Sequence, residues 1–198
     1  SLTANAATSA FNTDTRAEKV PVNTSFDKVF DVKYSSLMRF AGDVNANIIL
    51  PGVNANISYK IVQPDYTSLG TYYMSNNYHS LGITLSTTLF NRLSLTGTFS
   101  GQEDNLSNEQ MFTTCGYIYG ANATMRLGNN FNIGANYNGY LQTQRDGTVK
   151  VNDSTKIHRM MQSFSITPSY AFETELLGHS LSLSLNYTEN KDLNDFAT

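Results

Sequence analysis

The chain of 198 residues is poor in cysteine, proline and charge, and it contains no tryptophan and no long apolar run. Cys115 is the only cysteine, which excludes an internal disulfide and a cysteine-based metal cluster. A transmembrane helix needs about 20 predominantly apolar residues, and no stretch provides them. The formal net charge of −3 leaves no basic surface of the kind that binds nucleic acid, so we expect no nucleic-acid partner.

Charged residues make up only 15% of the chain, compared with roughly 25% in an ordinary soluble domain. Serine, threonine, asparagine, glycine and tyrosine take their place. The first residues, Ser1-Leu2-Thr3-Ala4, lack the basic and apolar regions of a signal peptide. For an exported protein, we therefore expect this sequence to be a mature or internal part of a longer chain.

What the chain does contain is alternation. Six stretches alternate apolar and polar residues with a period of two, which predicts antiparallel β-strands. They are Leu81–Phe90, Leu93–Gly101, Cys115–Leu127, Phe131–Thr143, Phe164–Phe172 and Leu181–Thr188. The first pair is joined by a short turn at Asn91-Arg92 and the second by one at Gly128-Asn129-Asn130. Pro168 weakens the fifth stretch, because proline cannot donate to a ladder of hydrogen bonds.

The first half of the chain also alternates apolar and polar residues, but less regularly. Val53–Ile61 alternates clearly and Leu2–Phe11 is a further predicted strand, whereas residues 12–27 have the composition of a loop. One apolar phase runs from Phe30 to Leu50, before a break at Pro51-Gly52. It predicts either one long strand or two strands that share a phase across a bend at Gly42.

Long polar links separate the predicted strand pairs and hold much of the charge. They are Gln63–Ser80, Gln102–Thr114 and Gln144–His158. No helical pattern and no domain boundary interrupt the series. The sequence therefore predicts an all-β fold over residues 1–198, an antiparallel up-and-down meander that forms a transmembrane β-barrel or part of one.

Three features favour a membrane barrel over a soluble β-sandwich. Within the predicted strands of residues 81–143, only Arg126 is charged, whereas a soluble sheet exposes Lys and Glu. Several predicted strands reach the about 9–11 residues of a tilted membrane crossing. Aromatic residues gather near strand ends, as in the interfacial girdles of barrels. These are Phe90, Phe131 and Phe172 beside short turns, and Phe99, Tyr117, Tyr137, Tyr140, Phe164 and Tyr187 nearer the long links.

Residues 57–105 resemble a pattern of large outer-membrane barrel proteins of the Bacteroidota, including the translocon barrel of the type 9 secretion system. The matching segments are Ile57-Ser58-Tyr59-Lys60, Pro64-Asp65-Tyr66-Thr67-Ser68-Leu69-Gly70-Thr71-Tyr72-Tyr73 and Gly101-Gln102-Glu103-Asp104-Asn105-Leu106. The resemblance implies a bacterial outer-membrane location with the long loops outside the cell. It implies outer-membrane lipid as a partner, and contact with other outer-membrane or periplasmic proteins is a further expectation.

The expected function is that of a pore, a transporter or a secretion channel. Arg126 lies on the predicted inward phase and is a candidate for setting the electrostatic field of a lumen. The link 63–80 carries Tyr66, Tyr72, Tyr73 and Tyr78, which either bind a ligand such as a sugar or pack as a plug or rim against the barrel. The alternative function is a soluble extracellular β-sandwich that binds its ligand through this loop.

No residue pattern predicts an enzyme, a cofactor or a metal site. His79, His158 and His179 are scattered without the spacing of metal ligands. The acidic pair Glu103 and Asp104, and the loop Asp146–Asp153, do not follow the order of a calcium loop, so solvated loops are the expected role. Cys115 falls on the apolar phase, where a buried or lipid-facing thiol is expected rather than a nucleophile.

Overall fold

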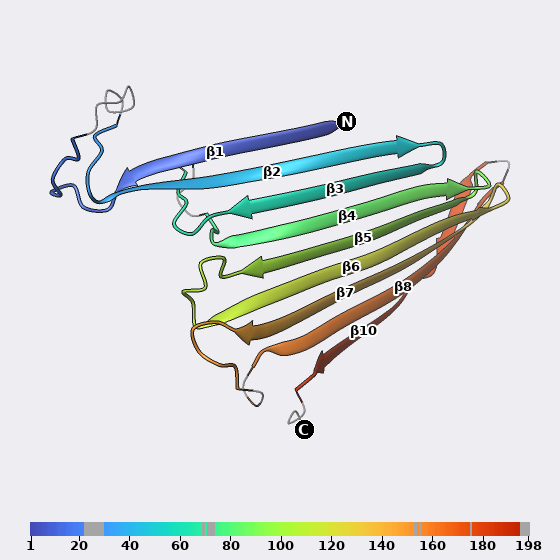
Figure 1. Cartoon of the computed structure of the whole chain (residues 1–198). Helices are drawn as coiled ribbons and strands as arrows, with labels where there is room; N and C mark the ends of the chain where they lie inside the picture. The colour runs from blue at the N-terminus through green and yellow to red at the C-terminus, as the bar shows by residue number, and fades with distance from the viewer. Residues whose placement is uncertain are drawn as a thin grey trace.

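The computed structural model describes residues 1–21, 30–68, 70, 74–152, 154, 156–174 and 176–194. Within these residues the protein is a single antiparallel sheet, which confirms the all-β prediction (Figure 1). No helix in the described part of the chain is long and apolar enough to span a membrane. The strands are β1 (Leu2–Asn12), β2 (Ser36–Leu50), β3 (Val53–Val62), β4 (Tyr78–Leu89), β5 (Leu93–Asp104), β6 (Phe112–Leu127), β7 (Phe131–Asp146), β8 (His158–Glu173), β9 (Gly178–Ser182) and β10 (Leu185–Asp192).

The strands form a meander. Each strand from β1 to β8 pairs with its neighbours in sequence, and both β9 and β10 pair with β8. Figure 1 shows the long loops gathered at one end of the sheet and the short turns at the other. Over the described residues the sheet is open, with β1 at one edge and β9 and β10 at the other. The meander is therefore confirmed, and closure into a barrel is not part of this structure.

The strands β9 and β10 occupy one position in the sheet. The pairs Ser169–Ser182 and Ile166–Leu185 belong to one continuous register, interrupted opposite Pro168. The N–H of Leu183 donates to the carbonyl oxygen of Pro168 at 3.1 Å. Pro168 has no N–H to donate in return, so the ladder is divided at that point. The predicted disturbance at Pro168 thus falls on the partner strand, while β8 itself runs through unbroken.

Five of the six predicted stretches are single strands, and the sixth, Leu181–Thr188, is divided between the end of β9 and the start of β10. The prediction was also wrong about where most of the strands meet the long links. Strand β5 continues to Asp104, and β6 begins at Phe112 and β7 ends at Asp146, each three residues beyond the prediction. In these three-residue extensions the main chains still pair, although the side chains are mostly polar. Consequently the links are shorter than predicted, and β5 carries Glu103 and Asp104 at its loop end.

The N-terminal strands resolve the choice left open by the sequence. Strand β2 is a single strand with Gly42 inside it, so the predicted bend at Gly42 is wrong, and Phe30–Tyr34 lie outside the strand. A side chain at Gly42 would meet the ring of Phe40 at 2.8 Å and the carbonyl oxygen of Asn5 at 3.2 Å. This close packing accounts for the glycine. Strand β1 is confirmed, residues 13–21 form the predicted loop, and residues 22–27 lie outside the described part.

The short turns have defined geometry. Gly52, with φ of 79°, follows Pro51, the order expected for a type II turn. Between β4 and β5 the N–H of Arg92 donates to the carbonyl oxygen of Leu89 at 3.1 Å. Phe90 and Asn91 both have φ of 54°, as in a type I′ turn. The centre of this turn therefore lies one residue earlier than predicted.

The register is staggered regularly across the sheet. Val53, next to the turn between β2 and β3, pairs with Thr87, two residues before the last residue of β4. Leu93, just after the next short turn, pairs with Met125, again two residues before the end of β6. The stagger is thus one residue per strand. Each strand is thus offset from its neighbour by about 3.3 Å along its length, at a spacing of about 4.8 Å. For all the short turns to lie at one level, this offset requires the strands to tilt by about 35°.

Within the described part of the chain, the sheet has no second layer. The protein exposes 14189 Å², whereas a folded monomer of 21.9 kDa exposes roughly 9,300 Å². The buried side chains among the described residues all lie toward the loop end. They are Ala41, Val62, Tyr66, Asn77, Asn105, Thr113 and Cys115. The middle of the sheet therefore has two uncovered faces.

Candidate functional site

One face of the sheet, the apolar face, is continuous across all strand positions. Paired residues share a face, and one such row runs from β3 to β10. It consists of Ala55, Leu85, Gly97, Ala121, Tyr137, Phe164 and Tyr187. Tyr119 and Tyr137 have ring centroids 6.0 Å apart, and Phe99 and Tyr117 6.3 Å apart. Many of these large side chains are exposed, so none of the residues that the structure describes covers this apolar surface.

The opposite face, the polar face, is built mainly from small polar residues. A typical row consists of Thr98, Gly120, Asn138, Ser163 and Thr188. Its charged residues gather toward the loop end, apart from Arg126 and Glu173. Those at the loop end are Arg39, Asp43, Lys60, Asp104, Asp146, Arg159 and Asp192. The polar face therefore has an electrostatic gradient from a charged loop end to a nearly neutral middle.

Arg126 lies on the polar face, as predicted, but at the short-turn end, away from the charges gathered at the loop end. It is exposed, pairs with Asn132 and precedes the last residue of β6. Its main-chain N–H donates to the carbonyl oxygen of Arg92 at 2.9 Å. Within the described ranges its side chain makes no ion pair. The field of Arg126 therefore acts at the rim formed by the short turns.

The sequence reading missed three large side chains on the polar face. Ile118, Tyr140 and Met161 lie side by side on β6, β7 and β8. Tyr140 was expected among the girdle aromatics of the apolar face, and this was wrong because its pairing with Ile118 and Met161 sets it on the opposite face. A large apolar residue on the polar phase of its strand is the signal that would have found all three.

At the loop end, buried asparagines join two loops. Asn105 donates through Nδ2 to Oγ1 of Thr113 at 2.9 Å, and its Oδ1 accepts from the N–H of Gln110 at 2.9 Å. Oδ1 of Asn77 accepts from the N–H of Ser107 at 3.3 Å. Asn77 and Asn105 have φ of 61° and 62°, a conformation that asparagine tolerates better than most residues. The loops between β3 and β4 and between β5 and β6 are thus held together.

The loop that follows β7 is tied to the same structure. The N–H of Thr148 donates to the carbonyl oxygen of Gln110 at 3.0 Å, and that of Val149 to Met111 at 3.2 Å. A side chain at Gly147 would lie 2.5 Å from the carbonyl oxygen of Gln110. The loop end is consequently a packed cap rather than a set of independent loops.

The structure divides the four tyrosines of the predicted loop site. Tyr66 is buried with Ala41 and Val62, and Tyr78 packs against this cluster at the start of β4. Lys60 Nζ lies 5.8 Å from the centroid of the Tyr78 ring. Tyr72 and Tyr73 lie outside the described residues. Tyr66 and Tyr78 therefore pack against the loop end of the sheet.

Cys115 is buried at the loop end of the apolar face. Its Sγ accepts a hydrogen bond from Nε of Arg145 at 3.2 Å, and Arg145 also forms an ion pair with Glu103. Glu103 and Cys115 are cross-strand partners. The thiol is enclosed and the guanidinium is engaged, which confirms the expectation of a buried thiol.

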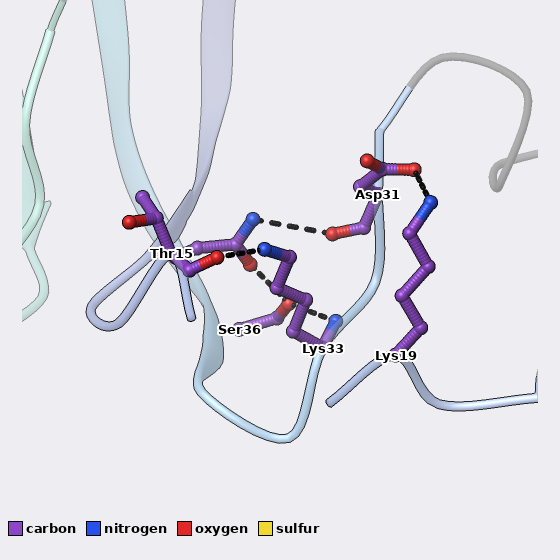
Figure 2. Close-up of polar contacts among 6 residues, drawn as sticks. Thr15, Lys19, Asp31, Lys33 and Ser36 are labelled. Atoms are coloured by element: carbon purple, nitrogen blue, oxygen red, sulfur yellow. Dashed lines mark hydrogen bonds and ion pairs between the residues drawn. The ribbon is translucent and has the colours of Figure 1, made fainter. Parts of the chain in front are cut away.

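The loop between β1 and β2 contains a polar cluster (Figure 2). Lys19 Nζ lies 2.8 Å from Oδ1 of Asp31, and Lys33 Nζ donates to the carbonyl oxygen of Thr15. Ser36 Oγ accepts from the N–H of Lys33 at 2.7 Å. The ammonium of Lys19 holds the pKa of the Asp31 carboxyl below its usual value through their hydrogen bond. These contacts fix the loop against the strand ends.

Comparison with known proteins finds no matching family model, no matching curated protein and no matching solved structure. Among the described residues, no group of three or more His, Cys, Asp or Glu side chains is arranged to hold a metal ion. The two faces of the sheet and the loop cap are therefore the features of this protein that bear on its function.

Proposed function

We propose that this sheet is part of an outer-membrane β-barrel of the bacterial cell surface, with a role as a pore, a transporter or a secretion channel. The observation that carries the proposal is the continuous apolar face, which no other layer covers. In this arrangement the apolar face contacts lipid and the polar face lines the lumen. The proposed role is not enzymatic.

The dimensions of the apolar face fit a bilayer. On β6 it extends from Tyr117 to Leu127, ten residue steps, or about 33 Å along the strand. At a tilt of about 35° this corresponds to a height of about 27 Å, close to the about 25 Å apolar band of outer-membrane barrels. The polar residues Glu103 and Arg145 lie just beyond this height, where lipid head groups begin. Short turns at the opposite end are typical of the periplasmic side.

The two edges support a larger barrel than this sheet alone. Antiparallel pairing alternates over nine strand positions, so β1 and β10 run in the same direction. An all-antiparallel closure therefore requires an odd number of further strands. Strand β1 contains no charge, proline or glycine, although soluble proteins use such residues to block exposed edges. This unprotected edge favours pairing with another strand.

The alternative, a soluble β-sandwich that binds through the loop 63–80, needs a second sheet over the apolar face. The described residues provide no such sheet, and Tyr66 of that loop is buried. These observations favour the membrane proposal.

Ala121 and Asn122 provide a matched test, because they are neighbours near the middle of β6 that face opposite sides. Ala121→Arg places a charge in the middle of the apolar face. It should cost about 2–4 kcal/mol in a bilayer and reduce insertion into liposomes. Asn122→Arg carries the same charge on the polar face and should insert like the unaltered protein. Floatation of refolded protein with liposomes measures both.

Equal insertion of the two variants would contradict the assignment of faces. A monomeric protein that unfolds cooperatively in detergent-free buffer would contradict the membrane proposal itself.

A further inference from the structure

The polar face contains an apolar row with polar side chains on both sides. Ile118, Tyr140 and Met161 are direct cross-strand neighbours, and Ile118 and Met161 are 54% and 48% exposed. Toward the loops, the adjacent row consists of Gln102, Gly116, Gln142, Arg159 and Asp192. Toward the short turns, the adjacent row consists of Thr98, Gly120, Asn138, Ser163 and Thr188. The combination is an apolar strip with hydrogen-bonding groups along both sides.

The strip borders a hollow of about 280 Å³ on the polar face. Its lining includes Ser100, Gln102, Gly116, Ile118, Tyr140 and Gln142, which come from three adjacent strands. The ring of Tyr140 leans over Gly116, where a side chain would lie 3.7 Å from Cε2 and from the hydroxyl oxygen. Because Gly116 has no side chain, the ring of Tyr140 can lie directly over it. The hollow is slightly smaller than the about 300 Å³ at which pockets for drug-sized ligands begin.

Several polar groups in this hollow are able to form further hydrogen bonds. Within the described residues, the side chains of Ser100, Gln102 and Tyr140 make no hydrogen bond to protein. Gln142 accepts through Oε1 from Nε and Nη2 of Arg159, at 2.9 and 2.7 Å. Its amide nitrogen is a donor that such an arrangement leaves available. Two amides and two hydroxyls are therefore in place for a polar ligand.

The chemistry of the strip selects among ligands. Arg159 is already engaged by Gln142, and the hollow itself is lined by one charged residue, Asp104, so an ionic ligand such as a phosphate is poorly matched. A sugar ring combines an apolar C–H face with a rim of hydroxyl groups. The apolar C–H face of the sugar suits Tyr140, Ile118 and Met161, and its hydroxyl groups suit the glutamine amides.

We propose that Ile118, Tyr140 and Met161, with Gln102 and Gln142, form a binding track for a neutral oligosaccharide chain. The sugar rings lie against the apolar row, and their hydroxyl groups exchange hydrogen bonds with the glutamine amides. The proposal deepens the proposed function, since it depends on the polar face lining a lumen and gives that lumen a class of solute.

The test uses the chain refolded in detergent and three neutral probes, maltohexaose, cellohexaose and mannohexaose, with binding followed by saturation-transfer NMR and calorimetry. We expect saturable binding of at least one probe. Ile118→Thr, which restores the polar character of this position, should weaken binding at least tenfold, and so should Gln102→Ala. Both side chains are dispensable for the described hydrogen bonds, so the variants should keep the native fold. Tyr140→Leu tests the ring itself.

Tyr187→Leu on the apolar face is the matched control for loss of a tyrosine and should bind as the unaltered protein does. The proposal is overturned if no probe binds, if Ile118→Thr and Gln102→Ala bind with unchanged affinity, or if a neutral Gly-Ser hexapeptide binds as tightly as the sugars. Liposome insertion is measured on the same samples. Insertion without sugar binding refutes the track alone, whereas sugar binding by a water-soluble protein refutes the membrane proposal alone.

Discussion

At the scale of single residues, glycine marks the places where main chains or rings come too close for a side chain. Gly147 is the clearest case, since its neighbours are the main-chain atoms of Gln110 and Met111 and cannot move aside cheaply. Gly139 faces the ring of Tyr119 in a similar way, but a ring can rotate. The packing of the cap therefore depends more on Gly147 than on any glycine inside the strands.

Gly147→Ala should separate the loop after β7 from the loop before β6. We expect faster amide hydrogen exchange at Thr148 and Val149 and a loss of about 1–3 kcal/mol, the usual range for overpacking. The control is Gly97→Ala, because nothing lies within 4 Å of a side chain at that position. An unchanged exchange pattern at Thr148 would mean that the loops are not joined.

Asn105 combines two structural tasks, a left-handed backbone and two buried hydrogen bonds. Asn105→Ala should cost about 2–4 kcal/mol, since it leaves Thr113 and the N–H of Gln110 without their partner in a buried site. Asn108→Ala is the matched control, with a similar φ of 54° but an exposed side chain. Denaturant unfolding in detergent measures the difference. Equal losses for the two variants would assign the effect to the backbone alone.

At the scale of elements, the division between β9 and β10 has a single cause. Pro168 receives a hydrogen bond from Leu183 and cannot return one. Pro168→Ala should restore the missing N–H and join β9 and β10 into one strand. We expect slower amide exchange in residues 183–187 and a gain of about 0.5–1.5 kcal/mol from the added hydrogen bond. Unaltered exchange there would show that Ser184 and its neighbours break the strand independently of the proline.

The sequence predicted that the strands exist. It did not predict where they end on the loop side, or that some large apolar residues lie on the polar face. Period-two alternation located β3 to β8 because one face is mainly apolar, and it treated the region of β9 and β10 as one strand. It failed between Gly101 and Asp104, where pairing continues after the side chains become polar. Parity along each strand places Ile118, Tyr140 and Met161 on the polar face, but their alignment into one row depends on the register between strands, which no single strand reveals. Arg126 was assigned to the correct face, since face follows from parity along one strand.

At the scale of the whole molecule, the open sheet has a direct biochemical consequence. Closed barrels resist sodium dodecyl sulfate until heated because they have no free edge. In this sheet β1 and β10 are free, so we expect residues 1–198 to migrate identically in gels with and without heating. A form with faster migration before heating would indicate that β1 and β10 pair in parallel and close the sheet by themselves.

In the proposed barrel, the stagger of one residue per strand also sets the direction of a bound chain. Ile118 lies nine residues before the last residue of β6, whereas Met161 lies twelve residues before the last residue of β8. With the short turns at one level, the row of Ile118, Tyr140 and Met161 rises toward the loop end from strand to strand. A chain bound along this row would be inclined to the barrel axis, so moving along the row would also rotate the chain about that axis.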